Sequence, residues 1–277
     1  MNPITWIYPP FRCPPLTDIT VTLAQSASFN AQLSHKDTKI IGQYWKEEKE
    51  KRGELFFSLK NSLASFVTKK RNSLLFSFTE FKEYLPVYLD YTKNTLSKRY
   101  FSSMRIASIN ALVLTRDNKI FVQRRSTTST HAPGLLDASI GGLCHIEQGS
   151  LFPLKTVMQR LEKELTLAPQ DIETIRLASV HLCPPPLGSC MFDFIVTVAM
   201  DSTTLRKKVA KSGNTGLFTE FFFIDFATVS DFIISHALFH KDITFDAVAT
   251  YLSILSQKEY PKVVALLAKG NITIGKK

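Results

Sequence analysis

The clearest change of hydrophobic pattern falls near the middle of the chain. Residues 105–114 are an almost continuous apolar run, 117–119 have the composition of a turn, and 119–124 are apolar again, a pattern that predicts a β-hairpin over 105–125. A loop rich in Ser, Thr, Pro and Gly follows and ends in Gly141-Gly142. Apolar residues then recur at helical spacing, which predicts a helix over 154–166 with Val157, Leu161 and Leu165 facing a sheet.

The C-terminal part continues this alternation of strands and helices. Residues 175–182 and 191–200 are apolar and predict two strands joined by a tight turn at Pro184–Gly188. Residues 221–226 predict a further strand, and the segments 228–240 and 242–268 have helical patterns. This order of elements favours an α/β protein with a mixed sheet and helices on its faces.

The first ~100 residues predict a smaller α+β extension. Short strands are expected at 19–23, 54–59 and 74–78, and a short helix is expected to begin at 79–82 and end at Pro86. Residues 36–52 predict a longer, charged helix with Trp45 packed inward and Gly53 just beyond its end. The extension carries several Phe residues that need a core, so we expect it to dock on the rest of the chain: Phe56, Phe57, Phe76, Phe78 and Phe81. We therefore divide the chain into an extension, 1–100, and a main domain, 101–277.

Composition narrows the class of protein. The chain has 277 residues, 44% of them hydrophobic, so it needs no disulfide or metal to stabilise its core. No apolar run reaches the ~18 residues that a transmembrane helix requires, and the first ten residues do not resemble a secretory signal. The four Cys residues are scattered. We therefore expect a cytoplasmic protein without a membrane anchor.

The net charge of +10 predicts anionic partners. The basic residues form only short clusters, at 69–71 and 206–211. A nucleic-acid-binding protein more often has a contiguous basic stripe on a recognisable module, so this pattern disfavours nucleic acid and favours small phosphate-bearing molecules.

One segment, between the predicted hairpin and the predicted helix, contains residues that are suited to a functional site. Gln123-Arg124-Arg125-Ser126 ends the hairpin, Ala132-Pro133-Gly134-Leu135-Leu136-Asp137 follows, and then come Gly141-Gly142 and the predicted helix. This order resembles the Nudix hydrolase family, whose box reads G-x5-E-x7-R-E-U-x-E-E-x-G-U, where U is aliphatic. The resemblance implies an α/β/α sandwich with a mixed sheet between helices. In the family, glycines let a loop turn beside a pyrophosphate, and helix carboxylates hold a divalent metal that activates water.

The match to the box is partial. Gly141 and Glu147 stand in the family's relation, with five residues between them, but the helix begins about four residues late. When the apolar positions are aligned, one helix carboxylate of three remains, Glu164. Arg160 and Lys163 replace the other two, and Thr166 replaces the box glycine.

The N-terminal extension resembles that of the UDP-sugar diphosphatase branch of the family. The similar features of the extension are the Ile41…Trp45 helix, Leu55-Phe56 and the 74–85 stretch. In the main domain, Thr215-Gly216-Leu217 and the strand after it also resemble this branch. The resemblance implies hydrolysis of a nucleoside diphosphate linked to another moiety. A UDP-sugar, cleaved to UMP and sugar 1-phosphate with weakly bound Mg²⁺ or Mn²⁺, is the first candidate.

The resemblance also assigns roles to residues. Glu164 would hold metal and act in catalysis, Glu147 would assist the metal, and Glu220 would be the loop carboxylate that helps to hold metal or water. Substrate would be bound by a set of cationic and glycine residues: Arg124, Arg125, Gly141, Gly142, Arg160 and Lys163. Neighbouring positions on a strand point to opposite faces, so we expect only one of Arg124 and Arg125 to reach the phosphate.

Three alternatives remain at this stage. The diphosphatase is the interpretation with most support. The first alternative is a non-catalytic Nudix module that binds a nucleotide or a protein partner, because Arg160 and Lys163 repel Mg²⁺ and are suited to pairing with phosphate. The second alternative, a basic RNA-associated protein, is supported only by the net positive charge. His181, Cys183 and Cys190 surround a Pro-rich turn, but they offer only three ligands to zinc.

Overall fold

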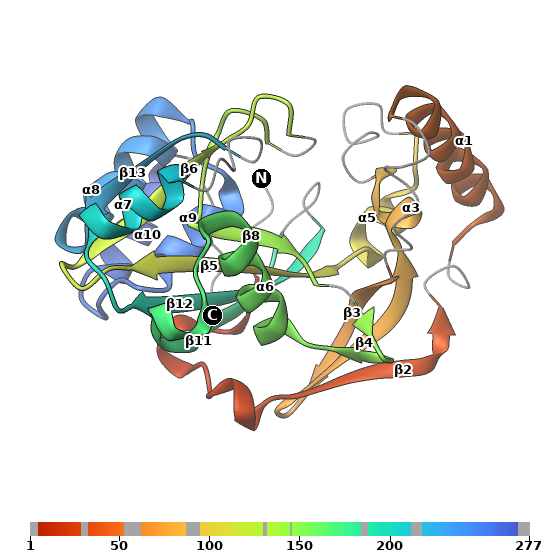
Figure 1. Ribbon diagram of the computed structural model, residues 1–277. Helices are drawn as coiled ribbons and strands as arrows, with labels where there is room; N and C mark the ends of the chain where they lie inside the picture. The colour runs from red at the N-terminus through yellow and green to blue at the C-terminus, as the bar shows by residue number, and fades with distance from the viewer. Residues whose placement is uncertain are drawn as a thin grey trace.

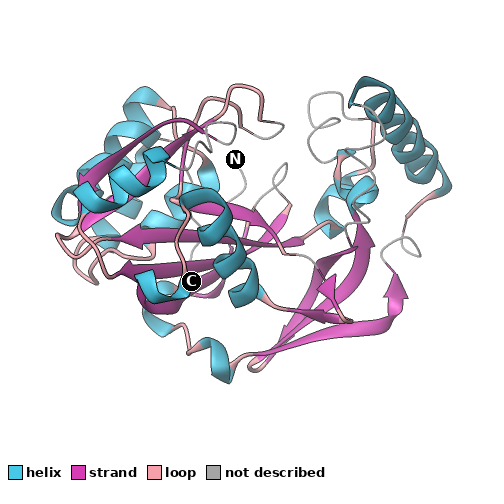
Figure 2. Ribbon diagram, viewed as in Figure 1, coloured by secondary structure: helices cyan, strands magenta, loops and turns pink. Residues whose placement is uncertain are grey.

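A computed structural model describes residues 5–28, 33–52, 62–86, 95–129, 132–144, 146–183, 188–211 and 218–270. The chain is an α/β protein in which a curled mixed sheet is flanked by helices (Figures 1 and 2). The strands are β1 (Thr5–Tyr8), β2 (Thr20–Ser28), β3 (Ser62–Lys70), β4 (Ser73–Glu80), β5 (Ile106–Leu114), β6 (Lys119–Arg125), β7 (Leu136–Asp137), β8 (Ile140–Leu143), β9 (Ile146–Glu147), β10 (Ser150–Leu151), β11 (Ile172–Leu182), β12 (Ser189–Val198) and β13 (Phe218–Asp225).

The helices cover the sheet and its ends. They are α1 (His35–Arg52), α3 (Phe81–Tyr84), α5 (Lys98–Ser103), α6 (Pro153–Leu165), α7 (Ser202–Lys211), α8 (Val229–Ile234), a π-helix (Ser235–His240), α9 (Phe245–Leu252) and α10 (Tyr260–Lys269), with short 3-10 turns at Pro10–Arg12, Leu16–Asp18, Pro169–Asp171 and Phe226–Thr228. Among the helices in the described ranges, none is long and apolar enough to cross a membrane.

The sheet is built around β5. The strands follow the order β1-β11-β12-β5-β3-β4-β2, while β6 and β8 also pair with β5, and β7 and β13 pair with β6. β12 runs parallel to β5, whereas β6 and β8 run antiparallel to it. The predicted hairpin over 105–125 is confirmed, with Leu114 opposite Ile120.

Alternate residues of β5 belong to two different cores. Ile109 and Ala111 are buried in one core with Val157 and Leu161 of α6, whereas Leu112 belongs to a second core with α8, α9 and α10. Because successive side chains of a strand point to opposite faces, α6 and α9 lie on opposite faces of the sheet. The predicted helix over 154–166 is confirmed, and Val157, Leu161 and Leu165 are fully buried.

The extension shares the sheet of the main domain. β3 pairs with β5 on one side and β4 on the other, and Leu74 and Phe76 lie in the same core as Phe192 of β12. The expected docking of the extension on the main domain is therefore confirmed. β1 pairs with β11 at the other edge, so residues 5–28 pass from one edge of the sheet to the other (Figure 1).

Some predictions for the extension are confirmed and others need correction. The helix over 36–52 is confirmed, although Trp45 is only half-buried and the inward positions are those of Ile41 and Tyr44. Phe78 was expected in a core but is 37% exposed, because the alternation of buried positions in β4 changes phase at Ser77, which is buried next to buried Phe76. Phe56, Phe57 and the strand expected at 54–59 lie outside the described residues, as does Gly53.

The main domain needs one further correction. The helix expected over 242–268 is two helices, α9 and α10, separated by turns at 253–259. Pro261 lies in the first turn of α10, where its missing N–H costs nothing, and this residue favours a new helix start over a continuous helix. The strands β1 and β3 and the helix α7 were not predicted. The tight turn after residue 183 and Thr215-Gly216-Leu217 are outside the described residues.

Candidate functional site

The candidate site lies where α6 crosses β8. Gly142 of β8 pairs with Ile109 of β5, and the guanidinium of Arg160 from α6 lies directly against it. A Cβ atom at position 142 would be 2.6 Å from Nε of Arg160. Glycine at this position therefore leaves the space in which the Arg160 side chain rests.

Arg160 pairs with the helix carboxylate one turn later. Its guanidinium donates a hydrogen bond to Oε1 of Glu164 at 3.1 Å, and Glu164 is only 4% exposed. Burial raises the pKa of Glu164, and the neighbouring Arg160 partly opposes that rise. Glu164 is thus a buried carboxylate with a cationic partner, not a solvated surface residue.

A second arginine–carboxylate pair lies beside the first. Arg125 at the end of β6 donates to Oδ2 of Asp137 at 2.5 Å, while the other carboxylate oxygen accepts hydrogen bonds from the backbone of Ala138 and the hydroxyl of Thr244. Burial and the nearby carboxylate of Asp246 raise the pKa of Asp137, and Arg125 opposes the rise.

The two pairs act on each other electrostatically. Asp137 raises the pKa of Glu164 and Arg125 lowers it, so the four side chains form one group, which we call the arginine–carboxylate cluster: Arg125, Asp137, Arg160 and Glu164. Both carboxylates are buried, whereas the side chains of the two arginines are about a quarter exposed, at 25% and 26%. The two arginines are therefore the part of the cluster that an anionic ligand can reach, and a guanidinium is suited to binding the oxygens of an anion.

The predicted Mg²⁺ or Mn²⁺ does not fit this arrangement as a resident ion. Such a cation needs carboxylate oxygens that face it, and here each buried carboxylate already has an arginine partner. Within the described ranges, no group of three or more His, Cys, Asp or Glu side chains is placed to hold a metal ion.

Arg124 and Glu220 form a further ion pair, between β6 and β13. Arg124 donates to Glu220 at 2.8 Å, to the carbonyl of Gly134 at 2.9 Å and to Asp242 at 3.2 Å, and Asp242 in turn is 2.7 Å from Nδ1 of His236. The hydrogen bond to Glu220 raises the pKa of Arg124. Arg124 thus bonds to Glu220, Gly134 and Asp242, whereas its neighbour Arg125 pairs with Asp137 in the cluster.

Glu147 and Lys163 lie on either side of Arg160 along the chain, on β9 and on α6. Glu147 pairs with Lys155 and accepts a hydrogen bond from Gln159, both on α6. Lys163 is exposed on the outer side of α6. The roles assigned to these residues, and to Glu220, stay predictions.

Gly141 borders a buried polar network on the other face. A Cβ atom there would lie 2.7 Å from Oδ1 of Asn110, whose amide donates to Thr250 at 3.0 Å. The Thr250 hydroxyl contacts Asp193 at 2.8 Å, and Asp193 accepts from Ser179 and contacts Nδ1 of His181.

This network also accounts for the residues that suggested zinc. Nε2 of His181 lies 3.4 Å from Sγ of Cys183, so both ring nitrogens of the buried histidine have protein partners. Burial raises the pKa of Cys183 and Cys190 well above the usual thiol value. These groups support the core rather than a metal site.

The sequence interpretation missed Asp137 and Asp246. Asp137 lies four residues before Gly141. It is paired across the sheet with Gln123, and Gln123 lies two positions before Arg125 in β6. An acidic residue that ends the Pro-Gly segment, near an arginine that ends a neighbouring strand, is the signal that would have indicated it. Asp246, on α9, is brought near only by the fold.

Comparisons with known proteins assign no family. No family model and no curated protein matches the sequence. Among solved structures, DR0079 from Deinococcus radiodurans aligns with 55% of this chain and 85% of its own chain, at 12% identity and a TM-score of 0.41. That likeness is too weak to assign a fold or a function.

Proposed function

We propose that this chain is a Nudix-type module that binds the diphosphate of a nucleoside diphosphate-linked compound. The observation that carries the proposal is the position of Arg160 against Gly142, with Arg125 in the same cluster. The family resemblance places a pyrophosphate beside the double glycine. Here a guanidinium lies at that place, so the module binds the anion directly with arginine.

The conformation at the end of α6 supports the Nudix part of the proposal. Thr166 ends the helix with φ of 58°, in the left-handed region. A β-branched residue is uncommon there, whereas glycine adopts it without strain. The resemblance aligns Thr166 with the glycine of the family box, so the backbone keeps the conformation that a glycine would favour.

The charge of the cluster supports an anionic ligand. Two guanidiniums and two carboxylates balance each other if both carboxylates are ionised, and burial favours their neutral forms. Any protonation of Asp137 or Glu164 leaves net positive charge on the arginines. UDP-glucose and UDP-galactose are the first ligands to test, because the extension resembles that of the UDP-sugar branch.

A second candidate function is the diphosphatase reaction itself, giving UMP and sugar 1-phosphate. It is favoured by the second carboxylate beside Glu164, because the charge of Asp137 adds to the effect of burial in raising the pKa of Glu164. An enzyme of this kind would lose its activity on Glu164→Gln.

The two functions are separated by measuring binding and turnover on the same protein. Calorimetry with UDP-glucose should detect binding, and Arg160→Gln should weaken it at least about tenfold, since a charged hydrogen bond is worth roughly 1.5–3 kcal/mol. Lys207→Gln is the matched control, because this exposed cation lies on α7, has no role assigned in binding, and should change the affinity less than about twofold.

Turnover is followed as release of UMP with Mg²⁺ or Mn²⁺ present. Binding without turnover supports the binding module, and turnover that is abolished by Glu164→Gln supports the diphosphatase. If Lys207→Gln weakens binding as much as Arg160→Gln does, or if no nucleotide sugar binds, the cluster is not the site.

A further inference from the structure

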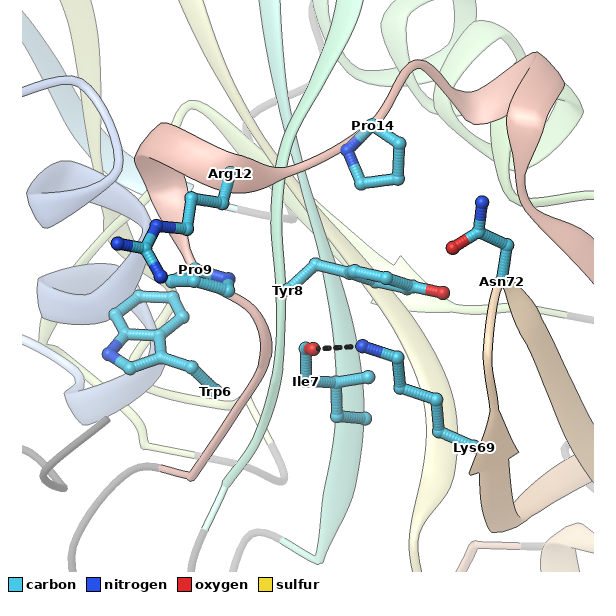
Figure 3. Close-up of a pocket in the computed structure, with 8 residues that line it drawn as sticks. All are labelled: Trp6, Ile7, Tyr8, Pro9, Arg12, Pro14, Lys69 and Asn72. Carbon is cyan, nitrogen blue, oxygen red and sulfur yellow. Dashed lines mark hydrogen bonds between the residues drawn. The ribbon is translucent and has the colours of Figure 1, made fainter.

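A separate cavity lies between the first strand and the β3–β4 turn. Its volume is about 460 Å³, within the range of roughly 300–1,000 Å³ that small-molecule sites occupy. Its walls come from β1 and the short turn after it, from β3 and from the residue before β4 (Figure 3): Trp6, Ile7, Tyr8, Pro9, Arg12, Pro14, Lys69 and Asn72. None of these belongs to the arginine–carboxylate cluster.

The lining joins flat apolar surfaces to positive charge. Trp6 and Tyr8 supply aromatic rings, Pro9 and Pro14 supply pyrrolidine rings, and none of the lining residues is acidic. In Figure 3, Trp6 and Arg12 lie on one side of the cavity and Lys69 and Asn72 lie on the other. An anionic group can therefore meet a cation on either side of the cavity, while a planar body meets the rings.

Lys69 is held in position for such a contact. Its Nζ donates to the carbonyl of Ile7 at 2.8 Å and lies 3.7 Å from the centroid of the Tyr8 ring. The Tyr8 hydroxyl donates to the carbonyl of Arg71 at 3.1 Å, which fixes the ring. An ammonium has three donors, and the contact with Ile7 uses one, so the group can also donate to a ligand oxygen.

We propose that this cavity binds a small organic anion that consists of a flat ring system and a phosphate, and that a nucleoside monophosphate is the first member of this class to test. The ring system packs on the aromatic and proline side chains, and the phosphate accepts a hydrogen bond from Lys69, while Arg12 supplies a second positive charge in the lining. The proposal does not depend on the function of the arginine–carboxylate cluster.

Trp6 provides a reporter inside the cavity. The chain has two tryptophans, Trp6 and Trp45, so the full-length Trp45→Phe protein carries its only indole at the proposed site. UMP, uridine and inorganic phosphate are titrated separately while indole fluorescence is followed, and calorimetry provides an independent measure of the same affinities.

We expect UMP to change the fluorescence with saturation and to bind at least tenfold more tightly than uridine or phosphate. Lys69→Gln should weaken UMP binding at least tenfold. Lys70→Gln, the next residue of β3 and not part of the lining, should leave it within twofold of the parent.

The cluster and the cavity are distinguished by one more variant. Arg160→Gln should not alter the Trp6 response to UMP, whatever it does to the binding of nucleotide sugars. The proposal is overturned by the absence of any saturable response, by equal binding of phosphate or uridine alone, by equal effects of Lys69→Gln and Lys70→Gln, or by loss of the Trp6 response in Arg160→Gln.

Discussion

Replacing Gly142 with alanine is expected to displace Arg160 and leave Glu164 without its partner. The new Cβ would meet three atoms of the guanidinium at 2.6–2.7 Å, well inside any real contact distance. Because these atoms are at the end of a flexible side chain, the clash itself is relieved by moving Arg160. The cost therefore comes from the lost pair with Glu164, which is 4% exposed.

The expected loss in the free energy of unfolding follows from how exposed Arg160 and Glu164 are. Breaking a fully buried pair costs roughly 3–5 kcal/mol, and an exposed pair contributes about 0–1 kcal/mol. The side chain of Arg160 is 26% exposed and that of Glu164 is 5% exposed, so this pair is intermediate. We expect Gly142→Ala to lower the free energy of unfolding by about 2 kcal/mol at pH 7.

The loss of free energy of unfolding caused by Gly142→Ala should decrease as the pH falls. The pKa of Glu164 is already raised in the folded protein, and removing Arg160 raises it further. A carboxyl group whose pKa is higher in the folded state than in the unfolded state favours folding as the pH falls. The difference between Gly142→Ala and the parent protein should therefore be smaller at pH 5 than at pH 7.

Urea unfolding at the two pH values measures this difference. In a Glu164→Gln background no buried carboxylate is left without a partner when Arg160 moves. There, Gly142→Ala should lower the free energy of unfolding by less than about 0.5 kcal/mol. Gly42→Ala on α1, where a Cβ would meet nothing within 4 Å, is the control for a glycine change without a clash. An equal cost of Gly142→Ala in both backgrounds and at both pH values would refute the reasoning.

Two other substitutions test features near the sheet. Thr166→Gly should raise the free energy of unfolding by about 1 kcal/mol in urea denaturation, because glycine relieves the left-handed strain at φ of 58°; no gain would mean that the threonine side chain compensates for the strain. Although burial acts to raise it, hydrogen bonds from Ser202 and Thr115 lower the pKa of Asp117 to about 2. The contribution of ionised Asp117 to the free energy of unfolding is complete above pH 4 and is lost as the pH falls toward 2. Asp117→Asn should therefore lower the free energy of unfolding by about 1 kcal/mol at pH 7, and by progressively less below pH 4. A constant cost across that range would contradict this assignment.

The sequence predicted the elements whose hydrophobic period is strong. The hairpin of β5 and β6 and the helix α6 were located closely, because their buried positions are almost all apolar. β3 was missed, since Ser62–Lys70 ends in exposed Val67, Thr68, Lys69 and Lys70 and lacks a regular alternation. α7 was missed because its basic residues were interpreted as a charge cluster, although buried Leu205 and Val209 have helical spacing.

The candidate site was predictable only in part. Arg125 and Arg160 were identified from the resemblance, but nothing in the local pattern indicates that Arg125 pairs with Asp137 or that Glu164 is buried. Those facts depend on how α6 lies across β8, and hence on tertiary packing. The partner of Arg124 is likewise set by the register between β13 and β6, in which Glu220 lies opposite Arg124.

The position of β1 has a consequence for synthesis on the ribosome. Thr5 pairs with Leu182, so after β1 leaves the exit tunnel about 170 more residues must be translated before its partner strand exists. During that interval the apolar side chains of Trp6, Ile7 and Tyr8 have no strand to pair with. Because long-range pairings form slowly and leave such surfaces available for wrong contacts, a nascent chain of this protein is expected to need protection by chaperones until β11 has emerged.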